Sequence, residues 1–529
     1  MNKRMSKRTV FFVVMGALIL GSVLLAAWDI RYPGLYYDEL IFTNASFLGP
    51  TDFFIRHRAF GVPVFIMDYI GALKSWLYLP IFSLLPVDEM TVRLPAILIG
   101  VAGGALLVGA LGNMYGRSAA IIGAVLILFD PSLLMHSRLD WGPTALMFFF
   151  RGVLVYSLTN WIVSGTPKWA WLAFFAILFG IFDKLNFLWL AGSSVCALAV
   201  SYPKRLRGFA VNHPRHACLL SLMGVLVFSS ALWYAMSLSS TIGDAHEWNP
   251  RVHQMLRLMK LMLVGGGPLD FVAGDGMRLR HWVLPAHLLC IFAAIPGLWA
   301  LIRHPQRRYW LFICAWSIGT FLVFASTPGA TGYHHAAVLA GFPQALLAIP
   351  LALSFNARKT GHDMWHKIVA GTAIASCACL IIANLVCIRA FHLPTNPNWD
   401  RANTDVAHFA LEHPGHRYVT TDWGMGSQLL ALSKSRLNVG DNWPSFRDEQ
   451  MALHFIRRTA SQYKEFDVLA RTEKFENFKG NRRNLYYALD ALSLSATLIA
   501  EFPNTHGDVM IQVLRVTSSG QTTEVPTDE

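Results

Sequence analysis

The chain has 529 residues, of which 54% are hydrophobic and only 14% are charged. Soluble domains are nearer 45–50% apolar and about 25% charged, so this composition excludes an ordinary soluble protein and predicts an integral membrane protein. The net charge of +12 would suit a nucleic-acid binder, but the basic residues form short clusters between apolar segments, without interleaved aromatic residues. We therefore expect membrane lipids and no nucleic acid as partners, since retention of Lys and Arg on the cytoplasmic side explains most of the charge.

The first apolar segment, residues 10–28, follows Lys3, Arg4, Lys7 and Arg8. It is longer than the core of a signal peptide and has no clear cleavage site, so it predicts a retained anchor with a cytoplasmic N-terminus. The 7 cysteines all fall inside apolar segments. Neither a disulfide framework nor a thiolate metal site is therefore indicated.

A helix that crosses a bilayer needs about 20 largely apolar residues. Windows of this kind predict about eleven spans, near residues 10–28, 93–113, 117–135, 142–163, 168–183, 186–202, 217–238, 283–302, 309–326, 335–355 and 367–391. A further apolar candidate, 62–85, contains Asp68, Lys74 and Pro80. If it also crossed, every later basic cluster would change sides, against the positive-inside rule. We expect it to lie in the interface or to re-enter the membrane.

The predicted fold is a polytopic α-helical membrane domain over residues 1–391, with a large first periplasmic loop at 29–92 and another at 239–282. The odd number of spans places residues 392–529 outside the cell inner membrane. This polar tail of roughly 135 residues is long enough to fold alone. Strand patterns at His416–Thr421 and Val509–Val516, with helical patterns near 445–463 and 484–492, predict a small periplasmic α/β domain.

Three acidic residues are the candidate catalytic groups. Asp38 and Glu39 follow the first span, and Asp140 precedes the fourth, which places all three on the outer face. Ionisable groups at a bilayer edge are costly, so they usually do chemistry or bind charge. Helix capping is the alternative for Asp38, with a helix that starts at Glu39, and for Asp140, with a helix that starts near Trp141.

Basic residues on the same face oppose the positive-inside trend, and an anionic ligand such as a phosphate would explain them. The candidates are Arg138, Lys184, Arg257 and Arg280. Lys184 lies in a short hairpin between two spans, where snorkelling to the interface is the alternative.

His334 and His335 open a helix and are further candidates for substrate binding, although capping, packing or metal binding would also suit them. Adjacent side chains diverge on a helix, which makes the pair a weak metal signal. The run Asp244-Ala245-His246-Glu247 is similarly only suggestive of a metal. No cofactor is therefore assigned, and a divalent metal stays open. Arg151, in the middle of a span, should face the protein interior or a polar cavity rather than lipid.

The order of these features resembles that of a known family. Asp38-Glu39 in the first outer loop precedes an amphipathic interfacial stretch, and Arg93-Leu94-Pro95-Ala96 opens the second span. Gly116-Arg117 leads to the third span, and Ser137-Arg138-Leu139-Asp140 precedes the fourth. Over about residues 1–200 this pattern resembles the GT-C superfamily of polyprenyl-phosphate-sugar-dependent glycosyltransferases, in particular the bacterial protein O-mannosyltransferase and lipid A aminoarabinose transferase group.

The resemblance implies that Asp38 is the essential carboxylate, with Glu39 supporting it and Asp140 as the second acidic site. It also implies substrate-binding roles for Arg93 and Lys184, although the family usually has Thr-Lys-Gly where this chain has Asp183-Lys184-Leu185. The implied reaction transfers a sugar, with inversion, from a polyprenyl phosphate to a lipid, glycan or protein hydroxyl.

Two other classes of protein are possible. A transporter or lipid-sugar flippase with an accessory periplasmic domain would also be polytopic, but such proteins tend to repeat broken helices in two halves. This chain shows no such repeat, and its acidic residues gather at one face. An inactive membrane scaffold with a binding tail would not need Asp38, Glu39 and Asp140.

Overall fold

The computed structural model describes residues 6–47, 55–242, 248–327, 332–356 and 363–517. It divides into two compact bodies. The membrane body contains Met1–Ile30, His57–Lys74 and Arg93–Ala390. The C-terminal body contains Arg31–Arg56, Ser75–Val92 and Phe391–Glu529, so it includes much of the first predicted loop.

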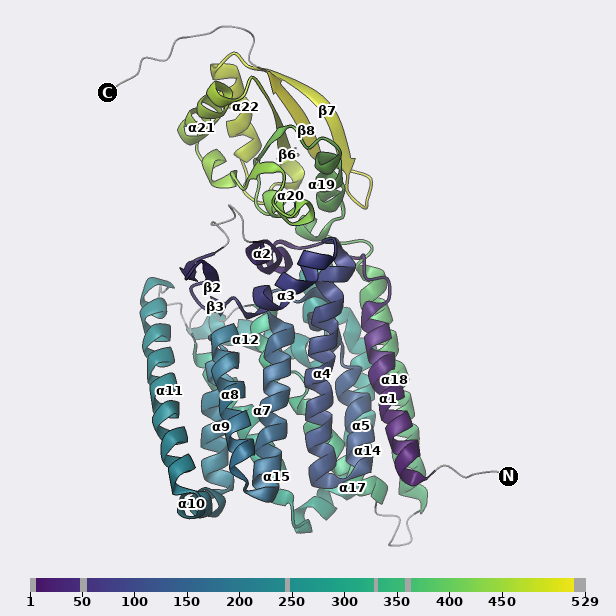
Figure 1. Ribbon diagram of the computed structural model, residues 1–529. Coiled ribbons are helices and arrows are strands. Elements are labelled where there is room, and N and C mark those ends of the chain that lie inside the picture. The colour runs from purple at the N-terminus through teal and green to yellow at the C-terminus, as the bar shows by residue number, and fades with distance from the viewer. Residues whose placement is uncertain (1–5, 48–54, 243–247, 328–331, 357–362, 518–529) are drawn as a thin grey trace. The chain divides into compact units, whose positions relative to one another are not determined.

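The membrane body is a set of helices that run side by side (Figure 1). Its helices are α1 (Lys7–Ala27), α4 (Glu89–Tyr115), α5 (Arg117–Leu128), α6 (Pro131–Leu139), α7 (Thr144–Ser164), α8 (Pro167–Asp183), α9 (Phe187–Ser201), α10 (Pro203–Asn212), α11 (Pro214–Ile242), α12 (Trp248–Leu263), α13 (Gly267–Ala273), α14 (Arg280–Arg303), α15 (Arg307–Ser326), α16 (Tyr333–Ala336), α17 (Phe342–Asn356) and α18 (Asp363–Ala390). A helix lies in each of the predicted windows, while α12 and α13 lie in the predicted loop 239–282.

Among the described residues, 8 helices are long and apolar enough to cross a membrane, or 9 if α5 and α6, which meet at an angle of 53°, form one span. The helices α8 and α9 occupy two further predicted windows and are shorter, at 17 and 15 residues. The chain is therefore a multi-pass membrane protein, and the polytopic helical fold predicted from its sequence is confirmed.

Residues 62–85, the doubtful span, do not form one helix. They contain β2 (Val62–Met67), β3 (Ile70–Gly71) and α3 (Leu73–Leu84). Together with β1 (His57–Ala59), the strands make an antiparallel sheet in the order β1-β2-β3. Asp68 lies in the turn between β2 and β3, and Pro80 lies within α3.

Glycine and a buried arginine fix α7 within the helix bundle. A Cβ atom on Gly152 would lie 2.3 Å from the carbonyl oxygen of Gly103 in α4, so only glycine permits this close approach of two helices. Arg151 is 1% exposed, and its guanidinium donates to the carbonyl oxygen of Val338 at 2.9 Å and lies 4.8 Å from the ring centroid of Phe148. The predicted inward orientation of Arg151 is therefore confirmed.

The C-terminal body is built on a mixed sheet. Its elements are α2 (Tyr37–Ser46), α19 (Ala402–Glu412), β4 (Arg417–Thr420), α20 (Met425–Ser433), β5 (Asn438–Gly440), α21 (Glu449–Gln462), β6 (Glu465–Arg471), α22 (Asn481–Ala491), β7 (Ser495–Pro503) and β8 (Val509–Thr517). The sheet order is β5-β4-β6-β8-β7. Strand β4 is parallel to β5 and β6, whereas β8 is antiparallel to β6 and β7.

The core of this body lies between the sheet and the helices α21 and α22. Alternate residues of β6, Phe466, Val468 and Ala470, enter the core and pack with Ile456 of α21 and Leu485 of α22. These side chains lie on one face of β6, and the residues between them are buried as well, because β6 is a central strand of the sheet. The two strands and two helices predicted from the tail are present, so the mixed α/β character of the tail is confirmed.

Candidate active site

Asp140 connects two helices of the membrane body. It ends α6 in the left-handed conformation, with φ 41° and ψ 41°, which is unusual for a residue other than glycine. Its Oδ1 accepts hydrogen bonds from the backbone nitrogen of Ala145 at 2.7 Å and from Thr144 Oγ1 at 3.0 Å. These bonds satisfy donors in the first turn of α7, so Asp140 caps this helix, although the helix begins at Thr144 with Pro143 as its N-cap residue and not near Trp141.

The other carboxylate oxygen of Asp140 forms a buried ion pair with Lys74. The Nζ of Lys74 lies 2.8 Å from Asp140 Oδ2 and also donates to the backbone oxygen of Asp140 at 3.2 Å. Both residues are 3% exposed. A pair so far removed from water needs such additional hydrogen bonds to offset its desolvation. Sequence reasoning missed this role of Lys74; the available signal was a lysine within an apolar stretch.

Lys184 and Asp183, in the turn after α8, are buried beside this pair. The Nζ of Lys184 donates to the carbonyl oxygen of Gly142 at 2.7 Å. Gly142 has φ +70°, a conformation that favours glycine, and a Cβ atom there would lie 2.9 Å from this Nζ and displace it. Lys184 is 1% exposed, so the snorkelling interpretation is wrong.

Neither carboxylate oxygen of Asp183 has a hydrogen-bond partner within the part of the chain that the structure describes. Its charged neighbours are Asp140, Lys184 and Lys74. We refer to Lys74, Asp140, Asp183 and Lys184 as the buried charge cluster. Two ammonium groups and an unsatisfied carboxyl group in one buried place can receive a polar ligand, in particular an anion held by charge-assisted hydrogen bonds.

Histidine and tryptophan rings adjoin the buried charge cluster. Trp141 Nε1 donates to His334 Nδ1 at 2.9 Å, so we assign the hydrogen of the His334 ring to Nε2. His136 stacks on Trp141 with ring centroids 5.0 Å apart, and the rings of His334 and His335 are 4.2 Å apart. A Cβ atom on Gly142 would lie 3.4 Å from the His334 ring. Lys184 and His334 therefore both lie against this glycine, a proximity that no local sequence pattern indicates.

The described residues contain no group of three or more His, Cys, Asp or Glu side chains placed to hold a metal ion. The run Asp244-Ala245-His246-Glu247 lies outside the described residues. The paired histidines make packing and hydrogen-bond contacts instead: the Nδ1 atoms of His334 and His335 accept from Trp141 and from the backbone nitrogen of Gly332.

Two predicted substrate-binding residues, Arg138 and Arg93, are turned toward the chain at the end of α1. The guanidinium of Arg138 is fully buried and donates to the carbonyl oxygens of Ala26, Trp28 and Asp29 at 2.5–2.9 Å. Arg93 donates to the carbonyl oxygen of Ile30 at 2.9 Å. Cations at a helix C-terminus satisfy its unpaired carbonyl groups, so these contacts give both arginines a structural role.

The last two basic candidates are more exposed. Arg257 pairs with Asp270 at 3.0 Å, but its side chain is 67% exposed. Asp270 also accepts a short hydrogen bond from Tyr333, the residue before His334. Arg280 is exposed at the start of α14. Of the five predicted basic residues, only Lys184 therefore belongs to the buried charge cluster.

Asp38 and Glu39 belong to the C-terminal body, where both lie in the first turn of α2. The helix begins at Tyr37 and Tyr36 is its N-cap residue, so the interpretation of Asp38 as an N-cap is wrong. Glu39 is 1% exposed, and its Oε2 accepts from the backbone nitrogen of Tyr36 at 2.9 Å. Glu39 thus has a helix-capping contact, whereas Asp38 is only partly buried.

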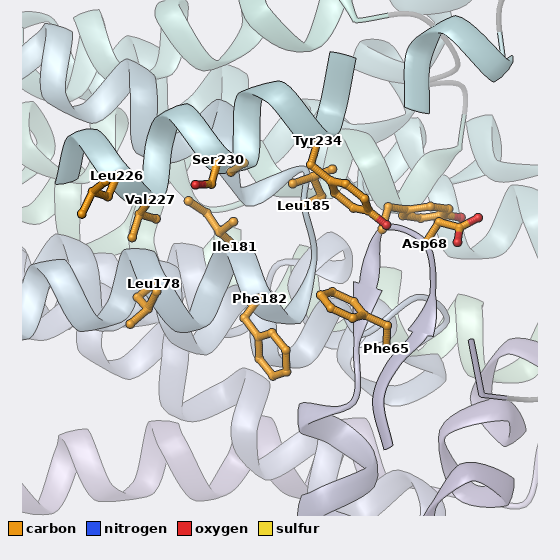
Figure 2. A pocket seen from close by; sticks show the side chains of 12 residues that line it. Phe65, Asp68, Leu178, Ile181, Phe182, Leu185, Leu226, Val227, Ser230 and Tyr234 are labelled. Carbon is orange, nitrogen blue, oxygen red and sulfur yellow. The ribbon is translucent and has the colours of Figure 1, made fainter. Parts of the chain in front are cut away.

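An apolar cavity of about 400 Å³ opens in the membrane body beside the Lys184 turn. Leu178 and Ile181 of α8 face Leu226 and Val227 of α11 across it (Figure 2). Leu185, the neighbour of Lys184, also lines the cavity and donates from its backbone nitrogen to the carbonyl oxygen of Tyr69 at 3.0 Å. The cavity therefore shares a backbone segment with the buried charge cluster.

Comparison with solved structures identifies the fold. The apo structure of ArnT from Cupriavidus metallidurans matches with a TM-score of 0.60 and 14% identity, over 96% of this chain and 98% of that chain. The structure of the same protein bound to undecaprenyl phosphate matches with a TM-score of 0.58 and 13% identity, over 97% and 99%. No protein-family model and no curated protein matches the sequence.

A third match is the archaeal oligosaccharyltransferase AglB from Archaeoglobus fulgidus, in complex with an inhibitory peptide and a dolichol-phosphate. It has a TM-score of 0.52 and 12% identity over 88% of this chain and 70% of that chain. The chain therefore has the fold of ArnT and AglB.

The buried charge cluster leads to a prediction about stability. Replacing Lys74 with Met leaves the Asp140 carboxylate buried without its cation, which should lower the free energy of unfolding by about 3–5 kcal/mol. Adding Asp140→Asn should recover part of this loss, because the amide oxygen still caps α7 and both charges of the ion pair are then gone. The measurement is denaturant unfolding of the purified protein in detergent.

The matched control is Arg257→Ala, which removes an ion pair whose arginine is 67% exposed and should change the free energy of unfolding by less than about 1 kcal/mol. Equal losses for Lys74→Met and Arg257→Ala would contradict the prediction.

Proposed function

We propose that this chain is an inverting glycosyltransferase that moves a sugar from a polyprenyl phosphate to a hydroxyl acceptor. The observation that carries the proposal is the buried charge cluster, in which Lys74 and Lys184 lie close together. The fold of the chain, which is like that of ArnT, supports the same proposal. The proposed location is the outer face of the cell inner membrane. A sugar must then arrive on a lipid, because that side has no supply of nucleotide sugars.

The donor phosphate is the ligand proposed for Lys74 and Lys184. An ammonium group can donate several hydrogen bonds to phosphate oxygens and can stabilise the charge that returns to the polyprenyl phosphate when the sugar leaves. The apolar cavity beside Lys184 supports this assignment, since an isoprenoid chain needs an apolar surface next to its head group. The undecaprenyl phosphate bound by ArnT and the dolichol-phosphate bound by AglB are lipids of the proposed class.

Asp38 is the proposed general base. It takes the proton of the acceptor hydroxyl as the oxygen attacks the anomeric carbon, and the bond from that carbon to the phosphate oxygen breaks. A single displacement inverts the anomeric centre, so no covalent sugar–enzyme intermediate forms. The partly buried position of Asp38 leaves its carboxylate more accessible than that of Glu39.

The acceptor is a lipid, a surface glycan or a protein hydroxyl. A divalent cation bound with the donor phosphate is compatible with the proposal. The rival function, a transporter or lipid-sugar flippase, lacks comparable support, since the structural matches are to ArnT and AglB.

The proposed function is tested by mass spectrometry of glycolipids and glycoproteins from cells with and without the gene. We expect one class of glycoconjugate to lose a single sugar without the gene, and Asp38→Asn to fail to restore it. Loss of a general base lowers a rate by about 10²–10⁴-fold, while the amide keeps the shape of the side chain. Full restoration by Asp38→Asn would exclude Asp38 as the base, and identical glycoconjugates with and without the gene would exclude the function.

Donor binding gives a separate prediction. A charge-assisted hydrogen bond contributes about 1.5–3 kcal/mol, so Lys184→Met should weaken the binding of undecaprenyl phosphate to the purified protein by about ten-fold or more. Lys184→Arg should restore it only in part, because a guanidinium is planar and larger. Binding can be measured by calorimetry in detergent. Exposed Arg257→Ala is the comparison, and a larger loss there than for Lys184→Met would move the phosphate site to α12.

The proposed orientation predicts the outcome of reporter fusions. A periplasm-dependent reporter fused after Asp400 should be active, and the same reporter fused after Arg207 should be inactive. The reason is that Lys204, Arg205 and Arg207 form a basic cluster expected on the cytoplasmic side. A cytoplasmic signal from the fusion after Asp400 would overturn the orientation.

A further inference from the structure

The segment that leads into α2 is held by the C-terminal part of the chain. The ring of Tyr36 stacks on Trp399, with centroids 4.5 Å apart and planes 18° apart. Two residues earlier, Gly34 donates from its backbone nitrogen to the carbonyl oxygen of Trp399 at 2.7 Å. A Cβ atom on Gly34 would lie 2.8 Å from the carbonyl oxygen of Asp400. The chain entering the helix that carries Asp38 is therefore fixed through both backbone and ring contacts.

Trp423 contacts both tyrosines that precede Asp38. Its ring meets that of Tyr36 edge-on, at 5.8 Å and 71°, and that of Tyr37 at 4.6 Å and 40°. Gly424, with φ +83°, has the left-handed conformation that glycine favours, and it packs against Tyr37. Burial, with the charge of Asp38 adding to it, raises the pKa of the Tyr36 phenol above its usual value.

Hydrogen bonds near both ends of α2 also hold this helix. Asn44 donates to the carbonyl oxygen of Ser427 at 3.1 Å, and Gln428 donates a short hydrogen bond to the carbonyl oxygen of Leu35. Both partners in α20 follow directly from the turn that contains Trp423. The start and the end of α2 are thus both held by hydrogen bonds to α20 in the C-terminal body.

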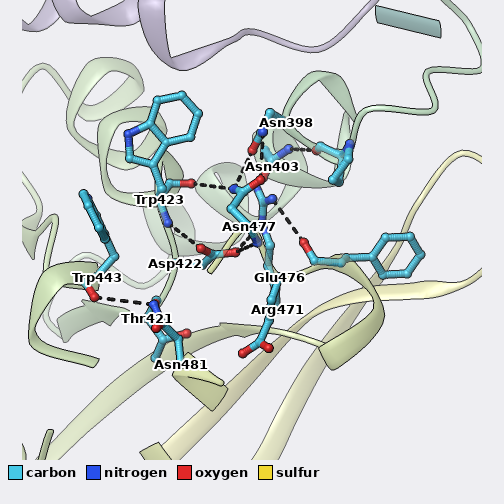
Figure 3. A network of polar contacts seen from close by, with 12 residues as sticks. Asn398, Asn403, Thr421, Asp422, Trp423, Trp443, Arg471, Glu476, Asn477 and Asn481 are labelled. Atoms are coloured by element: carbon cyan, nitrogen blue, oxygen red, sulfur yellow. Dashed lines mark hydrogen bonds and ion pairs between the residues drawn. The ribbon is translucent and has the colours of Figure 1, made fainter. Parts of the chain in front are cut away.

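A buried polar network surrounds Asp422, the residue before Trp423 in the turn (Figure 3). The carboxylate of Asp422 accepts from the backbone nitrogens of Trp423 and Asn477, each at 2.8 Å, and lies 3.7 Å from Arg471 Nε. Asp422 and Arg471 are no more than 1% exposed. Arg471 also donates to Asn403 Oδ1 at 3.0 Å. A buried pair of this kind adds little net stability, but its directional bonds fix the orientation of the turn.

We infer that Trp423 is a positioning residue for Asp38: the turn Asp422-Trp423-Gly424 holds the first turn of α2 so that the Asp38 carboxylate keeps the orientation that proton transfer needs. This inference rests on the proposed function, in which Asp38 is the general base. A base must lie within hydrogen-bond reach of the proton it takes, and a misplacement of about 1 Å can lower a rate by about 10²-fold. The C-terminal body thus takes part in the reaction through Asp38.

The test compares variants of the full-length protein in membranes, using the sugar product identified by the mass spectrometry described above. Trp423→Ala should lower the transfer rate by about 10–100-fold, while the affinity for undecaprenyl phosphate stays at the wild-type value. Trp423→Phe should restore most of the rate, because a phenyl ring still packs against both tyrosines. Trp423→Leu, which keeps apolar bulk without a ring, is the second variant in case Trp423→Ala does not fold.

The control is Trp443→Ala in the same body. Trp443 stacks on Phe478 with centroids 4.5 Å apart and makes no ring contact with α2 among the described residues. The Trp443→Ala variant should leave both the transfer rate and the hydrogen exchange of the α2 amides unchanged. Hydrogen–deuterium exchange should show faster exchange over residues 37–46 in Trp423→Ala and Trp423→Leu only.

Normal transfer by folded Trp423→Ala and Trp423→Leu, with Asp38→Asn inactive, would overturn this inference and leave the proposed function intact. Unchanged exchange over residues 37–46 in both variants would also overturn it. An active Asp38→Asn protein would overturn the role of Asp38 itself, which is the separate failure of the proposed function.

Discussion

The ion pair between Lys74 and Asp140 is the interaction on which the arrangement of the membrane body most depends. Lys74 stands at the start of α3, directly after the small sheet, and Asp140 stands where α6 ends and α7 begins. Because Asp140 also caps α7, one carboxylate links the first loop to two membrane helices. Loss of either charge would leave the other buried in a place of low polarity, so the two residues constrain each other.

The helices of the membrane body were predictable because a spanning helix leaves a long apolar run in the sequence. At residues 62–85 the apolar run alone suggests a further span, but the positive-inside rule argues against it, and the structure has short strands and α3 there. The sequence did not predict those strands, nor that Asp68 lies in a turn and Lys74 in an ion pair. An apolar average over a window shows that a segment is buried or interfacial, but the positions of its charges decide its shape.

The candidate site was predictable only in part, because the function of a basic residue depends on what lies next to it in space. Lys184 and Arg138 carried the same signal in the sequence, a cation on the face where few are expected. In the fold, Lys184 joins Lys74 and Asp140, whereas Arg138 donates to carbonyl groups at the end of α1. Lys74 and Asp140 are 66 residues apart in sequence, and no local pattern relates them.

The C-terminal body shows the same limit at the level of domains. Two of its strands, β4 and β8, were predictable from the strand patterns at 416–421 and 509–516. Its inclusion of α2 was not, since that association depends on ring contacts of Tyr36 and Tyr37 with Trp399 and Trp423. Under the proposed function α2 carries the general base Asp38, so these ring contacts give the C-terminal body a part in the reaction.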